Sequence, residues 1–161
     1  MKLDTWQVEN NIKFNNNKFK LLQFGKNKEL KESYTYLSPD LSDVIIPEDT
    51  VRDLGVTFNK DGNFSNHISN IAKKARQRIG MLLRSFMNRD ITFLKFCWRN
   101  YIQPILDYSS QLWGPSEDGD NLIKLEYLLK SFTSRARGLK NIHYWERLKL
   151  FGLSSVNRRI E

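Results

Sequence analysis

The spacing of apolar side chains along the chain changes near Asn63. Before that residue, apolar positions form short runs separated by Asn, Gly and Pro, which is typical of strands and turns. After it, apolar residues recur every three or four positions, the period of an amphipathic helix. We therefore predict an α+β fold, with a small antiparallel β unit over residues 1–62 and a mostly helical bundle over residues 63–161.

Three segments predict the strands of the first unit. Residues 19–24 read FKLLQF ahead of a glycine, and residues 34–36 place a β-branched threonine between two tyrosines. Residues 51–58 read VRDLGVTF and predict a third strand. The Asn-rich run before the first strand is typical of a turn, because Asn hydrogen-bonds its own backbone.

The first two helices are predicted by their apolar stripes. The first has Ser65 as its expected N-cap. The second is expected to start at Asp90 and to kink or break at Pro104, which has no N–H to donate. The stripes are Ile68, Ile71, Ala75, Ile79, Leu82 and Phe86 on the first helix, and Phe93, Cys97, Tyr101 and Ile105 on the second.

Two more helices and a short last stretch follow. The third helix is expected from about Asn121, with Gly138 as its stop, and the fourth is expected to end at Gly152. The last stretch, residues 156–160, is expected to be capped by one of the two serines just before it. The apolar stripe of the third helix is Leu122, Leu125, Leu129, Phe132 and Ala136.

The charge distribution indicates a class of partner. The chain has 26 Lys and Arg against 18 Asp and Glu, a net charge of +8. Residues 1–66 carry a net −1, whereas residues 67–161 carry +9. This basic balance favours nucleic acid over a membrane. No apolar run has the length of a spanning helix, and the first ten residues lack a signal-peptide core. We therefore expect an intracellular protein, nuclear or cytoplasmic and not secreted, with no membrane partner.

Groups that carry catalysis are sparse in the sequence. The single cysteine, Cys97, excludes an internal disulfide and a cysteine-based zinc cluster, and its apolar helical face predicts a buried, inert thiol. Glu48-Asp49 is read as a solvated loop. Asp118 and Asp120 lack the later ligands of a calcium loop. The residues alone therefore indicate no catalytic centre, no metal site and no cofactor.

The first predicted helix carries the strongest binding signal. On a helix with an apolar back, clustered cations fit phosphate contacts along a duplex, although a merely solvated face is the other interpretation. These cations are Lys73, Lys74, Arg76, Arg78 and Arg84. The aromatic side chains of Trp98, Tyr101, Tyr108 and Trp113 suit base stacking, but their helical spacing favours packing in the core.

Several sequence patches follow one another along nearly the whole chain. They are Phe14-Asn15-x-x-Lys18, Gln23-Phe24-Gly25, Arg52-Asp53-Leu54-Gly55-Val56-Thr57-Phe58, Phe64-Ser65-x-His67-Ile68, Tyr101-Ile102-x-Pro104-Ile105-Leu106-Asp107-Tyr108, Leu112-Trp113-x-Pro115 and Tyr144-x-Glu146-Arg147-Leu148. Each patch is weak alone, but in their order and spacing they resemble the reverse transcriptase of non-LTR, LINE-type retrotransposons.

The resemblance implies the end of the polymerase palm followed by the helical thumb, which closes on the primer–template duplex. It implies RNA–DNA hybrid or duplex DNA as the partner. It also implies that Lys18 is the lysine of the N-x-x-K element, near the incoming triphosphate in an intact enzyme. The family holds two Mg²⁺ ions on palm aspartates in an aromatic-x-Asp-Asp motif, which this chain lacks. We therefore expect no enzyme activity from the isolated chain, and an N-terminal β unit whose apolar strands are poorly covered and less stable.

Three interpretations stay open at the level of sequence. The chain is a fragment of such a reverse transcriptase, a free-standing basic helical module that binds nucleic acid or another partner, or a structural helical protein. An adjoining open reading frame that encodes the Asp-Asp motif supports the first interpretation.

Overall fold

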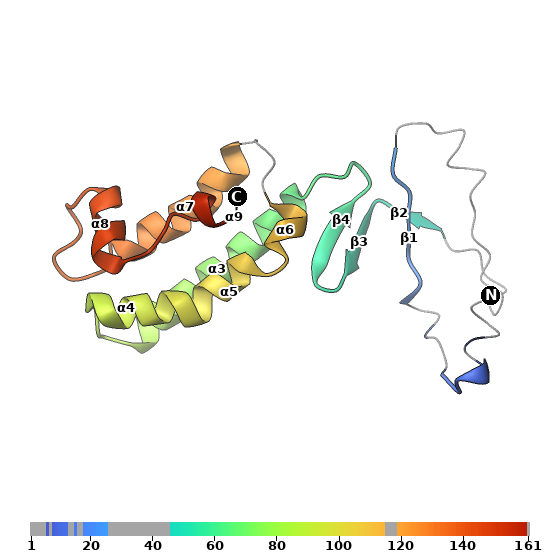
Figure 1. Cartoon of the computed structure of the whole chain (residues 1–161), viewed down its shortest axis with the longest axis horizontal. Coiled ribbons are helices and arrows are strands. Elements are labelled where there is room, and N and C mark those ends of the chain that lie inside the picture. Colours follow the sequence, from blue (N-terminus) through green and yellow to red (C-terminus); the bar gives the residue numbers. More distant parts are fainter. Residues whose placement is uncertain are drawn as a thin grey trace. The chain divides into compact units, whose positions relative to one another are not determined.

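The chain divides into two compact units, residues 1–64 and residues 65–161. The computed structural model describes residues 6, 8–12, 15, 18–25, 46–114 and 119–160 (Figure 1). Strands lie in the first unit and long helices in the second, so the predicted α+β class is confirmed. The division lies beside the boundary predicted between residues 62 and 63. The strand predicted at residues 34–36 lies outside the described residues.

The described strands of the first unit form two separate pairs. The strands are β1 (Leu21–Leu22), β2 (Pro47–Glu48), β3 (Thr50–Asp53) and β4 (Val56–Asn59). β3 and β4 are antiparallel, as predicted, whereas β1 and β2 are parallel. A parallel pair needs a long connection, and residues 23–46 provide one. The expectation of a wholly antiparallel unit was therefore wrong for β1 and β2.

Residues 51–58 form part of a hairpin and not the single strand predicted. The chain reverses at Leu54 and Gly55, whose φ angles are +45° and +87°. Positive φ at both central residues is the geometry of a type I′ turn, which matches the twist of the flanking strands. Such turns usually carry Asn-Gly or Asp-Gly. Leucine at the first position concealed this turn in the sequence.

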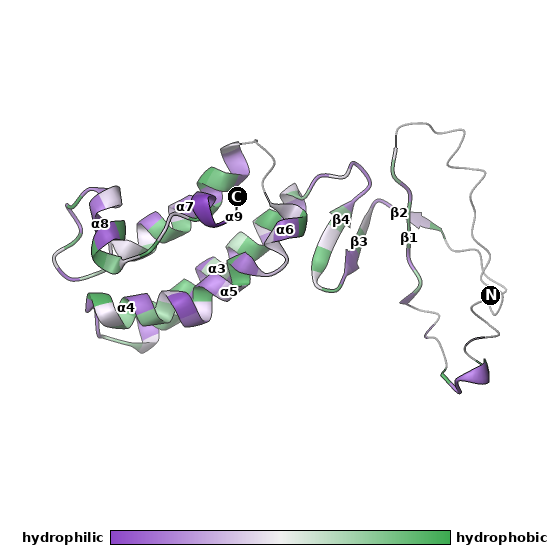
Figure 2. Ribbon diagram, in the orientation of Figure 1, coloured by the Kyte–Doolittle hydropathy of each residue, from purple (hydrophilic) through white to green (hydrophobic). Residues whose placement is uncertain are grey.

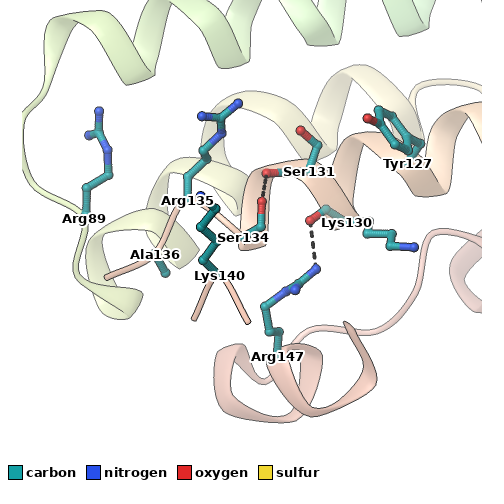
Figure 3. A pocket seen from close by; sticks show the side chains of 9 residues that line it. All are labelled: Arg89, Tyr127, Lys130, Ser131, Ser134, Arg135, Ala136, Lys140 and Arg147. Atoms are coloured by element: carbon teal, nitrogen blue, oxygen red, sulfur yellow. Dashed lines mark hydrogen bonds between the residues drawn. The ribbon is translucent and has the colours of Figure 1, made fainter. Parts of the chain in front are cut away.

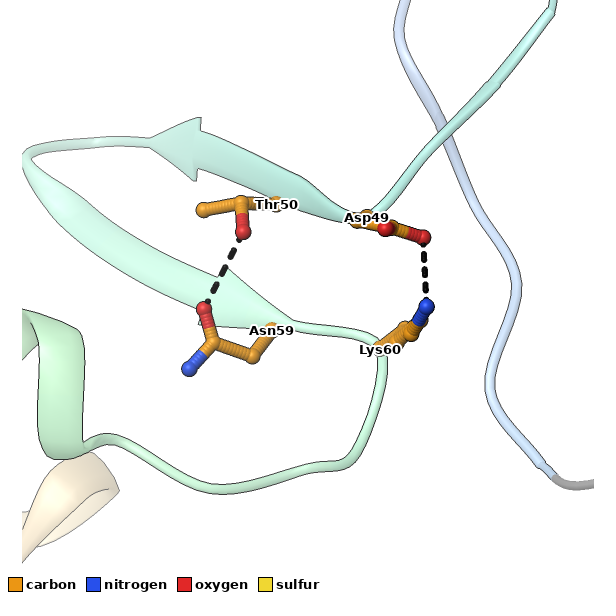
Figure 4. A network of polar contacts seen from close by, with 4 residues as sticks. All are labelled: Asp49, Thr50, Asn59 and Lys60. Atoms are coloured by element: carbon orange, nitrogen blue, oxygen red, sulfur yellow. Dashed lines mark hydrogen bonds and ion pairs between the residues drawn. The ribbon is translucent and has the colours of Figure 1, made fainter.

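Polar contacts close the open end of this hairpin (Figure 4). Lys60 Nζ lies 2.8 Å from Asp49 Oδ1, and the Lys60 N–H donates to the Asp49 carbonyl at 2.9 Å. Thr50 Oγ1 donates to Asn59 Oδ1 at 3.3 Å. Asn59 Nδ2 in turn donates to Asn63 Oδ1 at 2.8 Å. These contacts fix the hairpin to the loop that follows it.

Little apolar surface of the strands is covered. Within β1 to β4, Val56 and Asn59 are the buried residues. The apolar side chains of Phe24 and Ile46, next to β1 and β2, are 61% and 76% exposed. The described strands therefore derive little stability from hydrophobic burial.

The second unit is built from helices. They are α3 (Ser65–Ser85), α4 (Ile91–Cys97), the π-helical stretch η2 (Trp98–Ile102), α5 (Gln103–Asp107), α6 (Ser110–Trp113), α7 (Gly119–Thr133), α8 (Tyr144–Phe151) and α9 (Asn157–Ile160). α3 packs against α5 and α7, and α8 packs against α4 and α7. Ser65 is the first residue of α3, whereas the sequence analysis predicted it as the N-cap residue that precedes the helix.

The predicted interruption at Pro104 takes the form of a π-helical stretch. Proline lacks the N–H that would bond the preceding turn, and its ring crowds the carbonyl four residues earlier. The wider turn from Trp98 to Ile102 accommodates this, and the chain continues as α5. The buried face is Leu94, Cys97, Trp98, Ile102 and Leu106. The predicted stripe was therefore correct at Cys97 and otherwise displaced by about one residue, which leaves Tyr101 45% exposed.

The largest side chains in the core of the second unit are aromatic, among mostly aliphatic neighbours. The rings of Trp98 and Phe132 lie 5.4 Å apart between centroids. Trp113 is 1% exposed, and its indole N–H donates to the Tyr108 carbonyl at 2.8 Å. Phe151 of α8 is fully buried. Burial of large rings with their polar atoms bonded gives this unit an apolar centre.

The ends of α7 and α8 show where helix-stop signals in the sequence were correct and where they were not. α7 ends at Thr133, before the predicted stop, and Gly138 (φ +77°) instead lies in the turn that follows. α8 ends at Gly152 (φ +57°), as predicted. The N–H of Gly152 bonds the Lys149 carbonyl at 3.0 Å, and that of Leu153 bonds the Leu148 carbonyl at 3.0 Å. This arrangement is a Schellman-type cap.

Candidate nucleic-acid interface

Hydrophobic and hydrophilic residues alternate along the ribbon of α3 (Figure 2), as in an amphipathic helix. Its buried residues are His67, Ile68, Ile71, Ala72, Ala75 and Leu82. The five predicted contact residues Lys73, Lys74, Arg76, Arg78 and Arg84 are all exposed. The apolar stripe of the sequence is confirmed for its central part, whereas Phe86 follows the helix and is 46% exposed.

The five cations form two rows and not one stripe. At 100° per residue, Lys73, Arg76 and Arg84 project from the back and one flank of α3, while Lys74 and Arg78 project from the other flank. Lys73 and Arg84 are eleven residues apart, which is about 16 Å along the helix. A rigid duplex that touches one row therefore cannot engage all five side chains.

No acidic side chain neutralises these cations within the part of the chain that the structure describes. α3 itself contains no Asp or Glu. The ion pairs there join Lys20 to Glu48, Lys60 to Asp49 and Arg159 to Asp107. The positive field of α3 is consequently available to an external anion.

One glycine shapes the cationic back of α3. A Cβ on Gly80 would lie 3.4 Å from Nη1 of Arg84, so this guanidinium lies over the bare backbone of the glycine. The glycine costs helix stability, and it lets Arg84 lie close to the helix.

Lys18, the lysine implied by the family resemblance, belongs to the first unit. It is exposed and lies in a short turn in which its N–H bonds the Asn15 carbonyl at 2.9 Å. α3 belongs to the other unit. The resemblance to a palm lysine remains a prediction.

The aromatic candidates divide between core and surface. Trp98 and Trp113 are each 1% exposed, so they pack in the core. Tyr101 and Tyr108 are 45% and 54% exposed, and their rings are accessible to a base. Base stacking is therefore open to the two tyrosines only among these four.

The structure places no catalytic cluster among its described residues. Within that part of the chain, no three His, Cys, Asp or Glu side chains are close enough to hold a metal ion. Glu48 and Asp49 each pair with a lysine, as given above. Cys97 is 2% exposed, and burial raises the pKa of its thiol, as expected for an inert core cysteine. Asp118 lies outside the described residues.

The structure also shows a basic surface that the sequence analysis did not identify. A cleft of about 780 Å³ is lined by five cationic side chains, Arg89, Lys130, Arg135, Lys140 and Arg147 (Figure 3). They come from the segment after α3, the end of α7, the turn after it and α8. No periodic pattern joins residues so far apart in the chain, so only the packing reveals them.

The helices of the described segments are too short or too polar to cross a membrane.

Comparison with known proteins finds a distant relative. The chain is 27% identical over 113 residues to an uncharacterized protein of Caenorhabditis elegans. The matched part is 68% of this chain and 56% of the relative, so the chain spans little more than half of that protein. The chain matches no protein-family model, and no solved structure matches it.

Proposed function

We propose that residues 65–161 form a unit that binds nucleic-acid duplexes, and that the chain corresponds to the palm end and thumb of a LINE-type reverse transcriptase. The observation that carries this proposal is α3. Its apolar face lies in the core, and its five exposed cations have no acidic partner among the described residues. Such a helix offers phosphate contacts without information about base sequence.

The remaining features fit a role in binding rather than in catalysis. The described residues hold no carboxylate cluster that would bind two metal ions. Mg²⁺ and the aspartates that hold it belong to the intact family enzyme, which the chain resembles only in part. We propose that the chain binds a primer–template duplex inside a cell and does not extend it.

Duplex binding is tested by the salt dependence of affinity. About three of the five cations can reach phosphates together, because they occupy two rows. The logarithm of the association constant for duplex DNA should then fall with the logarithm of salt concentration with a slope of about −3. Fluorescence anisotropy with a labelled RNA–DNA hybrid and a DNA duplex measures affinity and slope.

A pair of charge-matched variants locates the interface. Replacement of Lys73, Lys74 and Arg76 by Gln should weaken binding to all duplexes alike and flatten the slope. The helix should persist, because Gln propagates a helix nearly as well as Lys or Arg. The control carries Lys124→Gln, Lys149→Gln and Arg158→Gln, which remove the same charge elsewhere in the unit. If the α3 variant remains folded by circular dichroism and binds with unchanged affinity and slope, α3 is only a solvated surface.

The alternative function is a free-standing module derived from such an element. Both proposals predict the same duplex contacts, so binding data cannot separate them. The adjoining genomic sequence separates them. A frame that encodes the aromatic-x-Asp-Asp motif in register with this chain supports the polymerase, and an expressed transcript that lacks it supports the module.

A further inference from the structure

The basic cleft of Figure 3 combines a wide opening with an entirely cationic set of charged side chains. None of the described residues that line it is acidic. Its volume of about 780 Å³ lies in the range of ligand sites, and each of its lining residues except Ala136 carries a positive charge or a hydroxyl group. Such a lining selects an anion.

Two of the five cations are held in place by the backbone. The Arg89 guanidinium donates to the carbonyls of Leu83 and Asn88 at 2.7 and 2.9 Å, and also to that of Phe86. These acceptors are neutral. The carbonyl end of α3, to which Leu83 belongs, offsets part of the charge, and the rest stays as positive potential at the cleft wall.

The guanidinium of Arg147 is held in a similar way on the opposite wall of the cleft. Its side chain donates to the Ile142 carbonyl at 2.7 Å, the Lys130 carbonyl at 3.1 Å and Thr133 Oγ1 at 3.3 Å. It is 6% exposed, and no carboxylate pairs with it among the described residues. A buried guanidinium without a carboxylate favours an anion at the surface above it.

The other three cations have side-chain donors directed at solvent. Lys130, Arg135 and Lys140 are exposed and form no ion pair within the described residues. In Figure 3, Arg89, Arg135 and Lys140 extend toward the same side of the cleft. The hydroxyl of Ser134 donates to the Ser131 carbonyl at 2.8 Å, which fixes the last turn of α7 beneath them.

We propose that this cleft binds a phosphoryl group of an anion with two or more negative charges. Tetrahedral phosphate oxygens accept hydrogen bonds from several directions, which suits an arginine fork and two lysines that come from different segments. The phosphoryl group comes either from the end or backbone of a nucleic-acid strand or from a free diphosphate. The site is formed by the end of α7, the turn after it, α8 and Arg89 from the segment after α3, and it does not depend on duplex binding by the cations of α3.

Two probes test the site in the full chain. Inorganic pyrophosphate is titrated calorimetrically, and a 5′-phosphorylated single-stranded oligonucleotide is titrated by anisotropy. The test variant carries Arg135→Gln and Lys140→Gln, and the charge-matched control carries Lys149→Gln and Arg158→Gln. The test variant should bind about tenfold more weakly, because two charge-assisted hydrogen bonds are lost. The control should stay within about twofold.

The outcomes separate the two sources of phosphate. If the oligonucleotide competes with pyrophosphate, and the same variant also weakens oligonucleotide binding, the phosphoryl group of a nucleic-acid strand is the ligand. If pyrophosphate alone responds, the ligand is a free diphosphate. The proposal is overturned if neither probe binds, or if test and control variants weaken binding equally, since only net charge then matters. The α3 triple variant should keep its affinity for pyrophosphate, which separates this site from the duplex interface.

Discussion

The hydroxyl of Tyr144, on α8, donates a hydrogen bond to the carboxylate of Glu126, on α7. The second oxygen of that carboxylate accepts the backbone N–H groups of Val156 and Asn157 at 2.7 and 3.3 Å, at the start of α9. One acidic side chain thus connects three consecutive helices. A carboxylate near the first N–H groups of a helix also interacts favourably with the helix dipole.

Loss of this hydroxyl should destabilise the helical unit. Tyr144 is 8% exposed, so Tyr144→Phe keeps the buried ring and removes one hydrogen bond to a charged group. The expected cost is about 1.5–3 kcal/mol in the free energy of unfolding, measured by urea titration at neutral pH. The control is Tyr127→Phe, a tyrosine that is 61% exposed, which should change little. Equal stability of wild type and Tyr144→Phe would show that the contact contributes nothing.

The same contact predicts a dependence on alkaline pH. Burial, and then the hydrogen bond to Glu126, raise the pKa of Tyr144 well above its ordinary value of 10.0. In the unfolded chain the phenol ionises near that ordinary value, whereas in the folded chain it stays protonated. The contribution of the Tyr144 hydroxyl to the free energy of unfolding is therefore complete below about pH 10, and it is lost as the pH rises above that value.

The measurement is the difference in unfolding free energy between wild type and Tyr144→Phe at neutral pH and at about pH 11. Titration of the lysines affects both proteins and cancels in the difference. The advantage of the wild type should shrink at the higher pH, and a constant difference would contradict the predicted shift.

The sequence predicted what depends on local patterning. The α3 stripe, the end of α8 at Gly152 and the break near Pro104 all follow from period, αL preference and the missing proline N–H. Prediction from the sequence failed where tertiary packing or an unusual residue determines the local structure. Leucine at a positive φ concealed the hairpin turn, and the π-helical stretch displaced the buried face of the second helix. The basic cleft could not be predicted from the sequence, because Arg89 and Arg147 come together only in the folded structure.

Gly80→Ala should stabilise α3. Glycine inside a helix costs about 0.5–1 kcal/mol relative to alanine, and the site does not require a positive φ. The new methyl would lie 3.4 Å from Nη1 of Arg84, the end of a flexible side chain that can move. We expect a gain of up to about 1 kcal/mol, measured by thermal unfolding of the full chain. A loss of stability would show that the close approach of Arg84 matters more than helix propensity.

Arg147→Met should destabilise the second unit by about 3 kcal/mol, because it removes hydrogen bonds to two part-buried carbonyls and one buried hydroxyl. Met keeps much of the volume of the side chain, so the loss reports the hydrogen bonds. Chemical denaturation measures it, with Lys149→Met on the exposed side of α8 as the control. An effect no larger than that of the control would mean that the buried guanidinium is dispensable.

Leu54→Asn should stabilise the hairpin of the first unit. Leu54 has a φ of +45° and is 83% exposed, so its side chain contributes little packing while its backbone is strained. Asn adopts this conformation more readily, which is worth about 1 kcal/mol. Slower amide hydrogen exchange across β3 and β4 would record the gain, and exchange in α3 serves as the internal reference. Faster exchange in the hairpin would contradict the assignment of a strained turn.

Primer extension by the purified chain with Mg²⁺ and a primed RNA template should yield no product. Templated phosphoryl transfer needs carboxylates that hold two metal ions a few ångströms apart. The sequence contains no Asp-Asp pair, and its Glu48-Asp49 pair is bound to Lys20 and Lys60. Duplex binding should be retained in the same preparation, which distinguishes an inactive binding unit from a misfolded sample. Templated extension that persists through repurification, and that a chelator abolishes, would overturn this prediction and assign a catalytic role to groups not identified in the described residues.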